Sequence, residues 1–447
     1  MRTIRFAVAG LGVVGSETVR LLRSRSESLR RRLGARLELA AVCDRRAPTA
    51  ARRLGLPASV RRLTDPGRLA NLPGVDAVVE LLGGLEAPRR LVLGCLRRGL
   101  GVVTANKRLL AHAWDELREA AVRGKGRLHF EASVAGGIPI LKALDLSLAG
   151  DRVEAVYGIL NGTTNFILTR MAEGLPPQAA LRRAQELGLA ERTPALDLNG
   201  RDTADKVSIL ASLVTGSWLR PHQVRTQGIQ DIALEDMAFA ENALGRRVKL
   251  LGVARFLGAE PRVEAFVCPA LVPLEHPLAA VADEFNAVLV RAASAGDLMF
   301  YGRGAGAGPA ASAVLGDMLA LGRELISGAA PAAPRPGPAP RLADSDCAFY
   351  LRLGALDRPG VLCAVTAALS RLGISIATIN QPGACGIGSS AGAGRTDFLT
   401  AGGCDPKNVP IIITTHPTSP GAFGRALRGI LALPSVSRRH TVMRLLP

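Results

Sequence analysis

The sequence predicts an α/β protein with three folded parts: a doubly wound parallel sheet, a central α+β region and a small ferredoxin-like βαββαβ domain. Short apolar strands alternate with amphipathic helices up to about residue 130, which is typical of a parallel sheet covered on both faces. A Pro/Ala-rich stretch at 328–341 then separates a last segment of small-domain size. We expect the parts to span 1–133, 134–304 and 343–447, with a connecting segment at 327–342.

The first part should hold five short, buried strands joined by helices. Each strand is an apolar run, and the stretches between the runs have the spacing of amphipathic helices. An apolar helix at 305–326 follows a run of small residues and is expected to return to this part. The strands are expected at 4–9, 37–42, 77–80, 101–104 and 127–131, and two of the helices at 88–98 and 114–123.

The central part mixes helices and strands, and the last segment has the strand and helix order of a ferredoxin-like domain. A Gly/Ser-rich insertion at 383–408 is expected to extend a hairpin of that domain. In the central part we expect helices near 138–149, 164–173, 177–187 and 202–215, and strands near 152–159, 248–256 and 285–291. In the last segment we expect strands at 347–354, 374–380, 410–415 and 435–445, and helices at 360–372 and 420–431.

A glycine-rich turn follows the first strand directly and precedes a helix. Its sequence is Gly10-Leu-Gly12-Val13-Val14-Gly15. Gly12 would let the backbone approach a pyrophosphate, and the N-terminus of the helix would bind the charge of that pyrophosphate. This motif alone is a weak signal, but its place inside a strand–turn–helix unit makes it a strong prediction of a Rossmann-type dinucleotide site.

The end of the second strand bears on the choice between NAD and NADP. Asp44 is placed to bind a ribose 2′-hydroxyl of NAD, whereas Arg45 or Arg46 would bind the 2′-phosphate of NADP. Asp44 lies farther beyond the glycines than is usual. Both cofactors therefore stay open, with a slight preference for NADP.

The charge of the chain raises the question of nucleic-acid binding. Fifty-six Lys and Arg against 38 Asp and Glu give a formal charge of +18. The basic residues are dispersed through helix-like segments, and aromatic residues make up only 4% of the chain, so surfaces that stack on bases are scarce. We expect no nucleic-acid partner, although an anionic cofactor or substrate would benefit from the positive field.

The sequence also bears on location. No apolar run is long enough to span a membrane, and the first residues are typical of a buried strand and not of a signal peptide. The seven cysteines are odd in number and have neither CxxC nor metal-ligand spacing, which favours reduced thiols. We expect a cytoplasmic protein without a membrane partner.

The segment 188–206 gathers four charged side chains in a short stretch that begins as a loop and ends as a helix. If Asn199-Gly200 forms a turn and the helix starts after it, Asp202 and Lys206 lie four residues apart on one face. A carboxylate beside an amine fixes the position of the amine and tunes its proton affinity. The alternative is a solvated ion pair without a catalytic role.

Several segments, taken together, resemble homoserine dehydrogenase over nearly the whole chain. The family reversibly converts aspartate 4-semialdehyde to homoserine with NAD(P)H, in the route to threonine, methionine and isoleucine. The segments are the glycine turn, V-T-A-N-K-R-L-L-A at 103–111, E-A-S-V-A-G-G-I-P-I at 131–140, G-I-L-N-G-T-T-N-F-I-L-T at 158–169, the segment at 188–206 and L-M-F-Y-G-R-G-A-G at 298–306.

The resemblance implies roles for individual residues. Lys206 matches the proton donor of the family, Lys107 its second active-site lysine, and Asp202 a carboxylate that binds substrate and supports the chemistry. Further substrate contacts would come from Glu191, which would bind the amino group, and from Asp197, Gly162 and Thr163. The cofactor contacts implied by the motif and the resemblance together are Gly10, Gly12, Val13, Val14, Gly15, Asp44, Arg45, Thr104, Lys107, Gly188 and Gly306.

The resemblance further implies a sodium ion bound largely by backbone oxygens at Glu131, Val134, Gly136 and Ile138. The chain departs from the family at Thr193, where an acidic residue is usual, and at Cys43, where a basic residue is common. Neither departure removes a catalytic group. Cys43 weakens the inference of NADP.

The last segment resembles an ACT domain. Asp357-Arg-Pro-Gly-Val361 lies at its first strand-to-helix turn, and Val409-Pro-Ile-Ile-Ile413 at its third strand. Because ACT domains commonly bind amino acids, threonine is the expected effector; the alternative is a degenerate, purely structural domain. The resemblance also implies a homodimer or homotetramer. Competing functions are another amino-acid-linked dehydrogenase, such as an aspartate dehydrogenase, and a non-catalytic amino-acid sensor.

Overall fold

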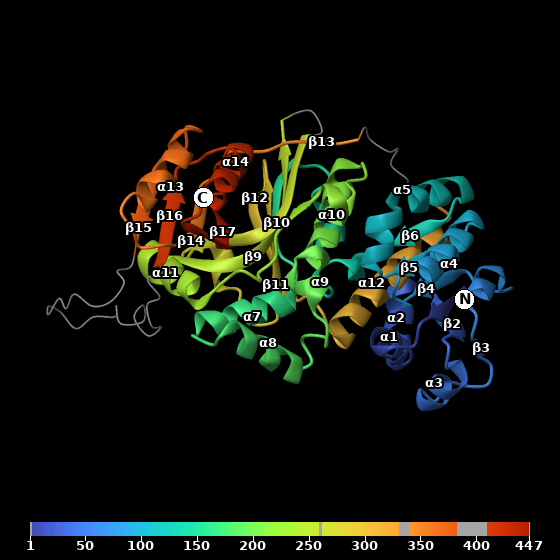
Figure 1. The fold of residues 1–447 in the computed structure, drawn as a ribbon. Coiled ribbons are helices and arrows are strands. Elements are labelled where there is room, and N and C mark those ends of the chain that lie inside the picture. The colour runs from blue at the N-terminus through green and yellow to red at the C-terminus, as the bar shows by residue number, and fades with distance from the viewer. Residues whose placement is uncertain (1, 259–261, 330–338, 382–408, 447) are drawn as a thin grey trace.

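The structure is a computed structural model that describes residues 2–258, 262–329, 339–381 and 409–446. Figure 1 shows three parts in a row, with the N-terminal part in blue at one end, the C-terminal part in orange and red at the other, and the central part between them. The expected insertion at 383–408 lies outside the described residues, as does most of the expected connecting segment.

The first part is a parallel sheet of six strands with helices on both faces, which confirms the predicted doubly wound fold. Apolar side chains of α1, α2 and α12 pack on one face, and those of α4 and α5 on the other. In sheet order the strands are β3 (Arg61–Leu63), β2 (Arg36–Cys43), β1 (Thr3–Ala9), β4 (Ala77–Glu80), β5 (Gly101–Thr104) and β6 (Arg127–His129). The helices are α1 (Val13–Ser24), α2 (Ser26–Leu33), α3 (Ala47–Arg53), α4 (Glu86–Arg97), α5 (Lys107–Gly124) and α12 (Ala307–Ser327).

Strand β3 was not predicted, and two of the boundaries that differ from the prediction bear on the site. Helix α5 begins at Lys107 and not at residue 114, because the Asn106 side chain accepts a hydrogen bond from Leu109 N (3.1 Å) and so caps the helix. The last strand ends at His129, and a short 3₁₀ turn starts at Glu131. Both differences matter for the site, since they place Lys107 in a first helical turn and Glu131 in a turn.

The central part supplies most of a second, mixed sheet. In sheet order its strands are β12 (Gly296–Arg303), β11 (Phe285–Ala292), β7 (Val153–Ile159), β9 (Arg246–Leu257) and β10 (Arg262–Pro273), with β8 (Arg225–Thr226) and β13 (Arg341–Leu342) also paired to β10. Its helices are α6 (Ile140–Lys142), which a π-helical turn (Ala143–Ser147) continues, α7 (Gly162–Ala172), α8 (Pro177–Glu186), α9 (Ala195–Leu198), α10 (Arg201–Thr215) and α11 (Leu234–Leu244). Strands β8, β10, β12 and β13 and helices α9 and α11 were not predicted.

The terminal domain has the predicted βαββαβ order. Its strands lie in the order β17 (Val436–Leu445), β14 (Phe349–Ala355), β16 (Val409–Thr415) and β15 (Ile376–Asn380), with helices α13 (Val361–Ser370) and α14 (Pro420–Leu431). Strand β17 also pairs in parallel with β10 through Ala270–Arg444 and Leu271–Leu445. The sheet of this domain therefore continues the central sheet, so that the domain is joined to its neighbour by more than a linker.

A buried carboxylate strengthens that junction. Asp236 of α11 is fully buried and accepts hydrogen bonds from the Tyr350 hydroxyl (2.7 Å) and from Arg352 Nε (2.7 Å) and Nη2 (2.9 Å) of β14. The Thr441 hydroxyl of β17 adds a longer contact to the same carboxylate at 3.3 Å. Helix α11 is thereby tied to two strands of the terminal domain.

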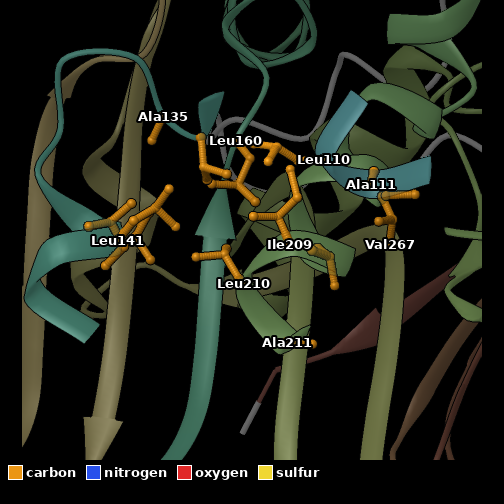
Figure 2. Close-up of a cluster of buried hydrophobic side chains, with 14 of the residues drawn as sticks. Leu110, Ala111, Ala135, Leu141, Leu160, Ile209, Leu210, Ala211 and Val267 are labelled. Carbon is orange, nitrogen blue, oxygen red and sulfur yellow. The ribbon is translucent and has the colours of Figure 1, made fainter. Parts of the chain in front are cut away.

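The first and central parts share a continuous core. Figure 2 shows Leu110 and Ala111 of α5 beside Leu160 and Ile209, where Leu160 follows β7 and Ile209 lies on α10. All four side chains are essentially excluded from solvent. The packing brings the start of α5 close to α10, which are the two helices that supply the lysines of the predicted site. Within the described ranges, no helix combines the length and hydropathy that a membrane span requires.

Candidate active site

The glycine turn occupies the carboxyl edge of the parallel sheet. Gly10 has φ +94°, and a Cβ there would lie 2.3 Å from the Leu81 carbonyl oxygen; a Cβ at Gly15 would lie 1.9 Å from the carbonyl oxygen of Gly10. Side chains are therefore excluded where the turn packs on its neighbours. A Cβ at Gly12, the residue that precedes α1, would meet no atom within 4 Å, and Val13 is 75% exposed beside it. The open side of the turn, together with the helix N-terminus, suits a pyrophosphate.

Asp44 is held against this turn. Its carboxylate accepts hydrogen bonds from Leu11 N (2.9 Å) and Arg46 N (2.9 Å). Burial raises the pKa of Asp44, but these backbone bonds and the adjacent arginines outweigh it and lower the pKa overall. The Arg45 side chain is exposed beside it. An ionised carboxylate and a guanidinium thus lie next to each other after β2, beside the glycine turn.

Helix α10 starts as predicted. Gly200 precedes the helix with φ +80°, and Arg201 is its first residue. The left-handed backbone at Gly200 ends the preceding Asn199 turn and lets the new helix begin at once. Asp202 and Lys206 then lie on one face, with Lys206 Nζ 2.8 Å from Asp202 Oδ2.

Asp202 binds both lysines of the predicted site. Its second oxygen lies 2.8 Å from Nζ of Lys107, the first residue of α5. Lys206 also donates to the Leu160 carbonyl at 2.5 Å. One carboxylate therefore draws together an ammonium group from the first part of the chain and one from the central part.

Two further polar groups surround this cluster. Asn161 caps α7 and directs its Nδ2 to Asp197 Oδ1 (2.7 Å) and Asp202 Oδ2 (3.0 Å). On the other side, His112 Nε2 lies 3.4 Å from Asp205 Oδ1. The cluster therefore contains three carboxylates and two lysines in a largely buried setting.

The charges of the cluster shift its ionisation in a consistent way. Burial raises the pKa of Asp202, but Lys206 and Lys107 outweigh that effect and hold it well below its usual range. Burial lowers the pKa of Lys107, yet Asp202 outweighs burial and raises it. At Asp197 burial dominates, and the pKa is raised. Lys107 thus stays an ammonium and Asp202 a carboxylate, while Asp197 is closer to neutrality.

The substrate residues named from the resemblance lie around the start of α7. Gly162 and Thr163 form its first turn, and the Thr163 hydroxyl donates to the Leu189 carbonyl (2.6 Å). That bond holds the segment after α8, in which Gly188 has φ +71°. Glu191 follows in this segment with an exposed side chain, and its backbone carbonyl accepts from Gln185. The structure therefore brings Asp197 into the lysine cluster but leaves the Glu191 carboxylate facing solvent.

A buried turn around Ala135 and Gly136 packs against the loop before α12. Ala135 and Gly136 have φ of +53° and +55°, and a Cβ at Gly136 would lie 2.4 Å from the Gly304 carbonyl oxygen. The turn is thus pressed against the loop that leads to Gly306 (φ +112°), the residue before α12. The Glu131 carboxylate stabilises the turn by accepting from the backbone N–H groups of residues 141 and 142. All four residues named for sodium (Glu131, Val134, Gly136 and Ile138) are buried.

Sequence reasoning missed several groups of this site. Asn161 stood within a quoted motif without a role, although an Asn before a helix start is a recognisable N-cap. The Leu160 carbonyl and the pairing of His112 with Asp205 left no signal, because they depend on how α5, α7 and α10 meet. Thr104, named as a cofactor residue, is fully buried and donates its hydroxyl to the Glu80 carboxylate.

A dinucleotide turn on a six-stranded parallel sheet, next to a carboxylate that binds two ammonium groups, defines the class of protein as a dinucleotide-dependent oxidoreductase. Comparison with known families gives the particular one. Residues 10–131 match the family model described as the NAD-binding domain of homoserine dehydrogenase, 139–319 that of homoserine dehydrogenase, and 349–382 that of the ACT domain. The chain belongs to the homoserine dehydrogenase family, and its terminal part is an ACT domain.

Individual relatives agree. The homoserine dehydrogenase of Mycobacterium tuberculosis is 39% identical over 99% of this chain and 98% of its own, and that of Corynebacterium glutamicum is 37% identical over 99% and 95%. A crystal structure of the homoserine dehydrogenase of Thiobacillus denitrificans superposes with a TM-score of 0.88, at 35% identity, over 100% of this chain and 99% of that one. A hyperthermophilic archaeal homoserine dehydrogenase in complex with NADPH matches 71% of this chain and 97% of its own, with a TM-score of 0.61 and 25% identity.

Proposed function

We propose that the chain catalyses the reversible, NAD(P)-dependent reduction of aspartate 4-semialdehyde to homoserine at the cluster of Lys107, Asp202 and Lys206. The observation that carries this proposal is the single Asp202 carboxylate between two ammonium groups, 2.8 Å from each. Carbonyl reduction requires both a positive charge and a proton at the carbonyl oxygen, and this arrangement supplies both.

A reduced dinucleotide, when bound at the glycine turn, would supply the hydride for the aldehyde carbon. Lys206 donates the proton to the oxygen on which negative charge develops. Its contacts with Leu160 and Asp202, within the part of the chain that the structure describes, use two of its three N–H donors and leave one for that oxygen. Lys107 adds a second positive charge, and Asp202 keeps both ammonium groups in place.

The amino-acid part of the substrate would bind between α7 and the segment after α8. The backbone N–H groups of Gly162 and Thr163 suit a carboxylate at the positive end of the helix. Asp197 and Glu191 would contact the substrate amino group. Since the Glu191 side chain is exposed in this structure, we propose that substrate binding draws the segment 188–194 inward.

The cofactor would lie on the glycine turn, with Val13 and Val14 at the pyrophosphate and Gly188 and Gly306 toward the nicotinamide. Asp44 supports binding of a ribose hydroxyl pair, as in NAD, and Arg45 supports binding of a 2′-phosphate, as in NADP. Thr104 would contribute through its backbone, because its hydroxyl is bound to Glu80. An assay with both cofactors distinguishes the two preferences.

A sodium ion is proposed at the turn formed by Glu131, Val134, Gly136 and Ile138. The four residues are buried, and backbone carbonyl and carboxylate oxygens are the ligands that a hard cation prefers. The ion would keep this turn and the loop before Gly306 in register. Replacing sodium by a large organic cation in the assay buffer would then raise the KM for the cofactor; an unchanged KM would remove the ion from the proposal.

The ACT domain is proposed to bind threonine and to inhibit the reaction. The continuous sheet through β10 and β17 and the contacts of Asp236 give an effector a rigid connection to the central part. Threonine should lower turnover and raise the melting temperature of the intact chain. If it does neither, the domain has a structural role only.

The division of the chain and its assembly are also proposals. We assign 1–133 with 305–326 to cofactor binding, 134–304 to catalysis and dimerisation, 327–342 to the connection and 343–447 to regulation. The edge strand β12, on which Tyr301 is 56% exposed, supports a homodimer or homotetramer, which light scattering would measure. The five cysteines within the described ranges are free thiols, which supports a reducing compartment such as the cytoplasm.

The experiment that tests the proposed function is a spectrophotometric assay with homoserine and either NAD or NADP, repeated with threonine. We expect reduced cofactor to form at a rate that threonine lowers. No formation with either cofactor would remove the proposed reaction. A threonine-insensitive rate would leave the reaction in place and remove only the regulation.

A further inference from the structure

Glu80 is a fully buried carboxylate that the mechanism above does not use. It is the last residue of β4, at the carboxyl edge of the parallel sheet, and its solvent exposure is 0%. It lies opposite Ala9 of β1 on one side and Thr104 of β5 on the other. A charge is expensive at such a position, since a leucine or valine would fill the space without a desolvation cost.

The surroundings supply a full set of hydrogen bonds to this carboxylate. Oε2 accepts from the Thr104 hydroxyl at 2.6 Å, and Oε1 accepts from Leu82 N at 2.8 Å. Burial raises the pKa of Glu80, and bonds from Thr104, Leu82, the Asn106 side chain and the backbone of Gly83 only partly offset that rise. The donors come from the loop after β4 and from the turn after β5, so the carboxylate joins these two segments.

The same bonds continue to Lys107. The Thr104 oxygen accepts from Asn106 N at 3.0 Å, and Asn106 Nδ2 donates to the Gly84 carbonyl at 2.9 Å. Asn106 is the N-cap of α5, and Lys107 is the first residue of that helix. The turn at 104–107 therefore sets the direction in which the Lys107 side chain leaves the backbone. Glu80 stabilises this turn through its hydrogen bond with Thr104.

The loop after β4 also contacts the start of the glycine turn. Leu81 N donates to the Ala9 carbonyl at 2.7 Å, and the Leu81 carbonyl packs where Gly10 lacks a side chain. Glu80 thus lies where three segments come together. They are the glycine turn, the loop at 81–84 and the turn at 104–107. Ordinary packing explains the apolar residues at this edge, but it does not explain a buried carboxyl group that bonds to two of the segments.

We propose that Glu80 is a positioning residue: through Thr104 and Asn106 it fixes the start of α5, and so holds the Lys107 ammonium at Asp202 in the geometry that the reaction needs. The proposal rests on the role of Lys107 in the proposed function. Glu80 touches neither substrate nor the reacting atoms. Its effect is to keep the 2.8 Å contact between Lys107 and Asp202 in place across the boundary between the two parts of the chain.

The test uses two variants of the intact chain that weaken the connection at different points. Glu80→Gln keeps the shape and removes the charge, and Thr104→Val keeps the volume and removes the hydroxyl. Because a displacement of about 1 Å at a catalytic group costs up to about 100-fold in rate, we expect both variants to lower kcat by about 10-fold or more. Dinucleotide affinity, measured by NADPH fluorescence, should change much less than kcat.

Combination with Lys107→Ala separates positioning from a general structural effect. If Glu80 acts through Lys107, Glu80→Gln should lower kcat in the unaltered chain but should add no further loss when Lys107 is already alanine. Losses that multiply, or an unchanged kcat in Glu80→Gln, would overturn the proposal. Where Glu80→Gln does not fold, Thr104→Val with and without Lys107→Ala carries the same test.

A matched control is Asp236→Asn, which also neutralises a fully buried, hydrogen-bonded carboxylate but far from the site. It should lower the melting temperature while kcat without threonine stays the same. If Asp236→Asn lowers kcat as Glu80→Gln does, the effect of Glu80 is one of general stability and the proposal fails. A normal kcat for Lys107→Ala would instead remove the role of Lys107 from the proposed function, and this inference with it.

Discussion

Two buried aspartates join neighbouring parts of this chain, and they do so in different ways. Asp202 connects the first part to the central part by binding the ammonium groups of Lys107 and Lys206. Asp236 connects the central part to the ACT domain by binding the Arg352 guanidinium through both oxygens, together with the Tyr350 hydroxyl. Both carboxylates are paired with positive charge, yet the Asp202 side chain is 11% exposed whereas the Asp236 side chain is fully covered.

The difference lies in the partners. Lysine carries a compact point charge, and the Lys107 side chain is 37% exposed, so in the proposed function a substrate oxygen can approach its ammonium while the contact with Asp202 is kept. Arginine binds a carboxylate with a rigid planar fork, and the side chain of Asp236 is completely covered. The comparison teaches that a carboxylate shared by two separate lysines, one of them 37% exposed, suits the proposed chemistry, whereas a fully covered carboxylate held by one planar guanidinium serves cohesion.

The largest expected effect is a loss of turnover at the Asp202 cluster. Lys206→Ala removes the proposed proton donor, and since general acid catalysis contributes about 10²- to 10⁴-fold, we expect kcat to fall by about 1,000-fold. Binding of NADPH, followed by fluorescence, should survive because Lys206 lies away from the glycine turn. A near-normal rate would exclude Lys206 as the proton donor.

Loss of the Asp236 carboxylate should lower the free energy of unfolding. Asp236→Ala leaves the largely buried Arg352 guanidinium without this carboxylate, and we expect a loss toward the lower end of the about 3–5 kcal/mol that breaking a buried pair costs. Denaturant unfolding should show a loss of this size, with turnover per folded molecule retained in the absence of threonine. Unfolding free energy equal to that of the unaltered chain would mean that the junction depends on the β10–β17 pairing alone.

A third buried residue, Lys249, sharpens the comparison because its hydrogen-bond partners among the described residues are neutral. Lys249 is 2% exposed, and its ammonium contacts the Val281 carbonyl and, at 3.4 Å, Asn165 Oδ1. Burial, aided by Arg247, lowers the pKa of Lys249 to about 8. In the unfolded chain a lysine has a pKa of about 10.4. Between pH values of about 8 and about 10.4 the unfolded chain therefore binds more protons than the folded chain.

It follows that Lys249 makes the folded state more stable as the pH rises from about 8 to about 10.4, by a few kcal/mol at most. This stability is lost again as the pH falls through the folded pKa. Lys249→Met should remove that rise, which urea unfolding at pH 8 and pH 10 would measure in both proteins. Other groups that titrate in this range are common to the two proteins, so parallel pH profiles would contradict the depressed pKa.

Much of the fold was predictable from local signals. The glycine turn, the Asn199-Gly200 start of α10 and the βαββαβ order of elements in the ACT domain all follow from short sequence patterns, and the structure confirms them. Strand β10 was missed because it contains Pro269, which argues against a central strand. The structure accommodates this proline because β10 changes its second neighbour there, from β8 at residues 266–267 to β17 at residues 270–271.

The site was predictable in part. The i,i+4 pairing of Asp202 with Lys206 follows from helix geometry alone, and the structure confirms this contact. The contact of Lys107 with Asp202 depends on how α5 packs against α10. The roles of Asn161 and Glu80 depend on where strands and helices end in space. Such groups are set by tertiary packing, which a local pattern does not encode.

The most direct test is the turnover of Asp202→Asn, measured beside its melting temperature. This change keeps the shape of the side chain and removes the charge that Lys107 and Lys206 share. If this carboxylate organises the chemistry, turnover should fall by about 100-fold, while the melting temperature falls less than in Asp236→Asn. Turnover close to that of the unaltered chain would contradict the assignment of this cluster as the active site.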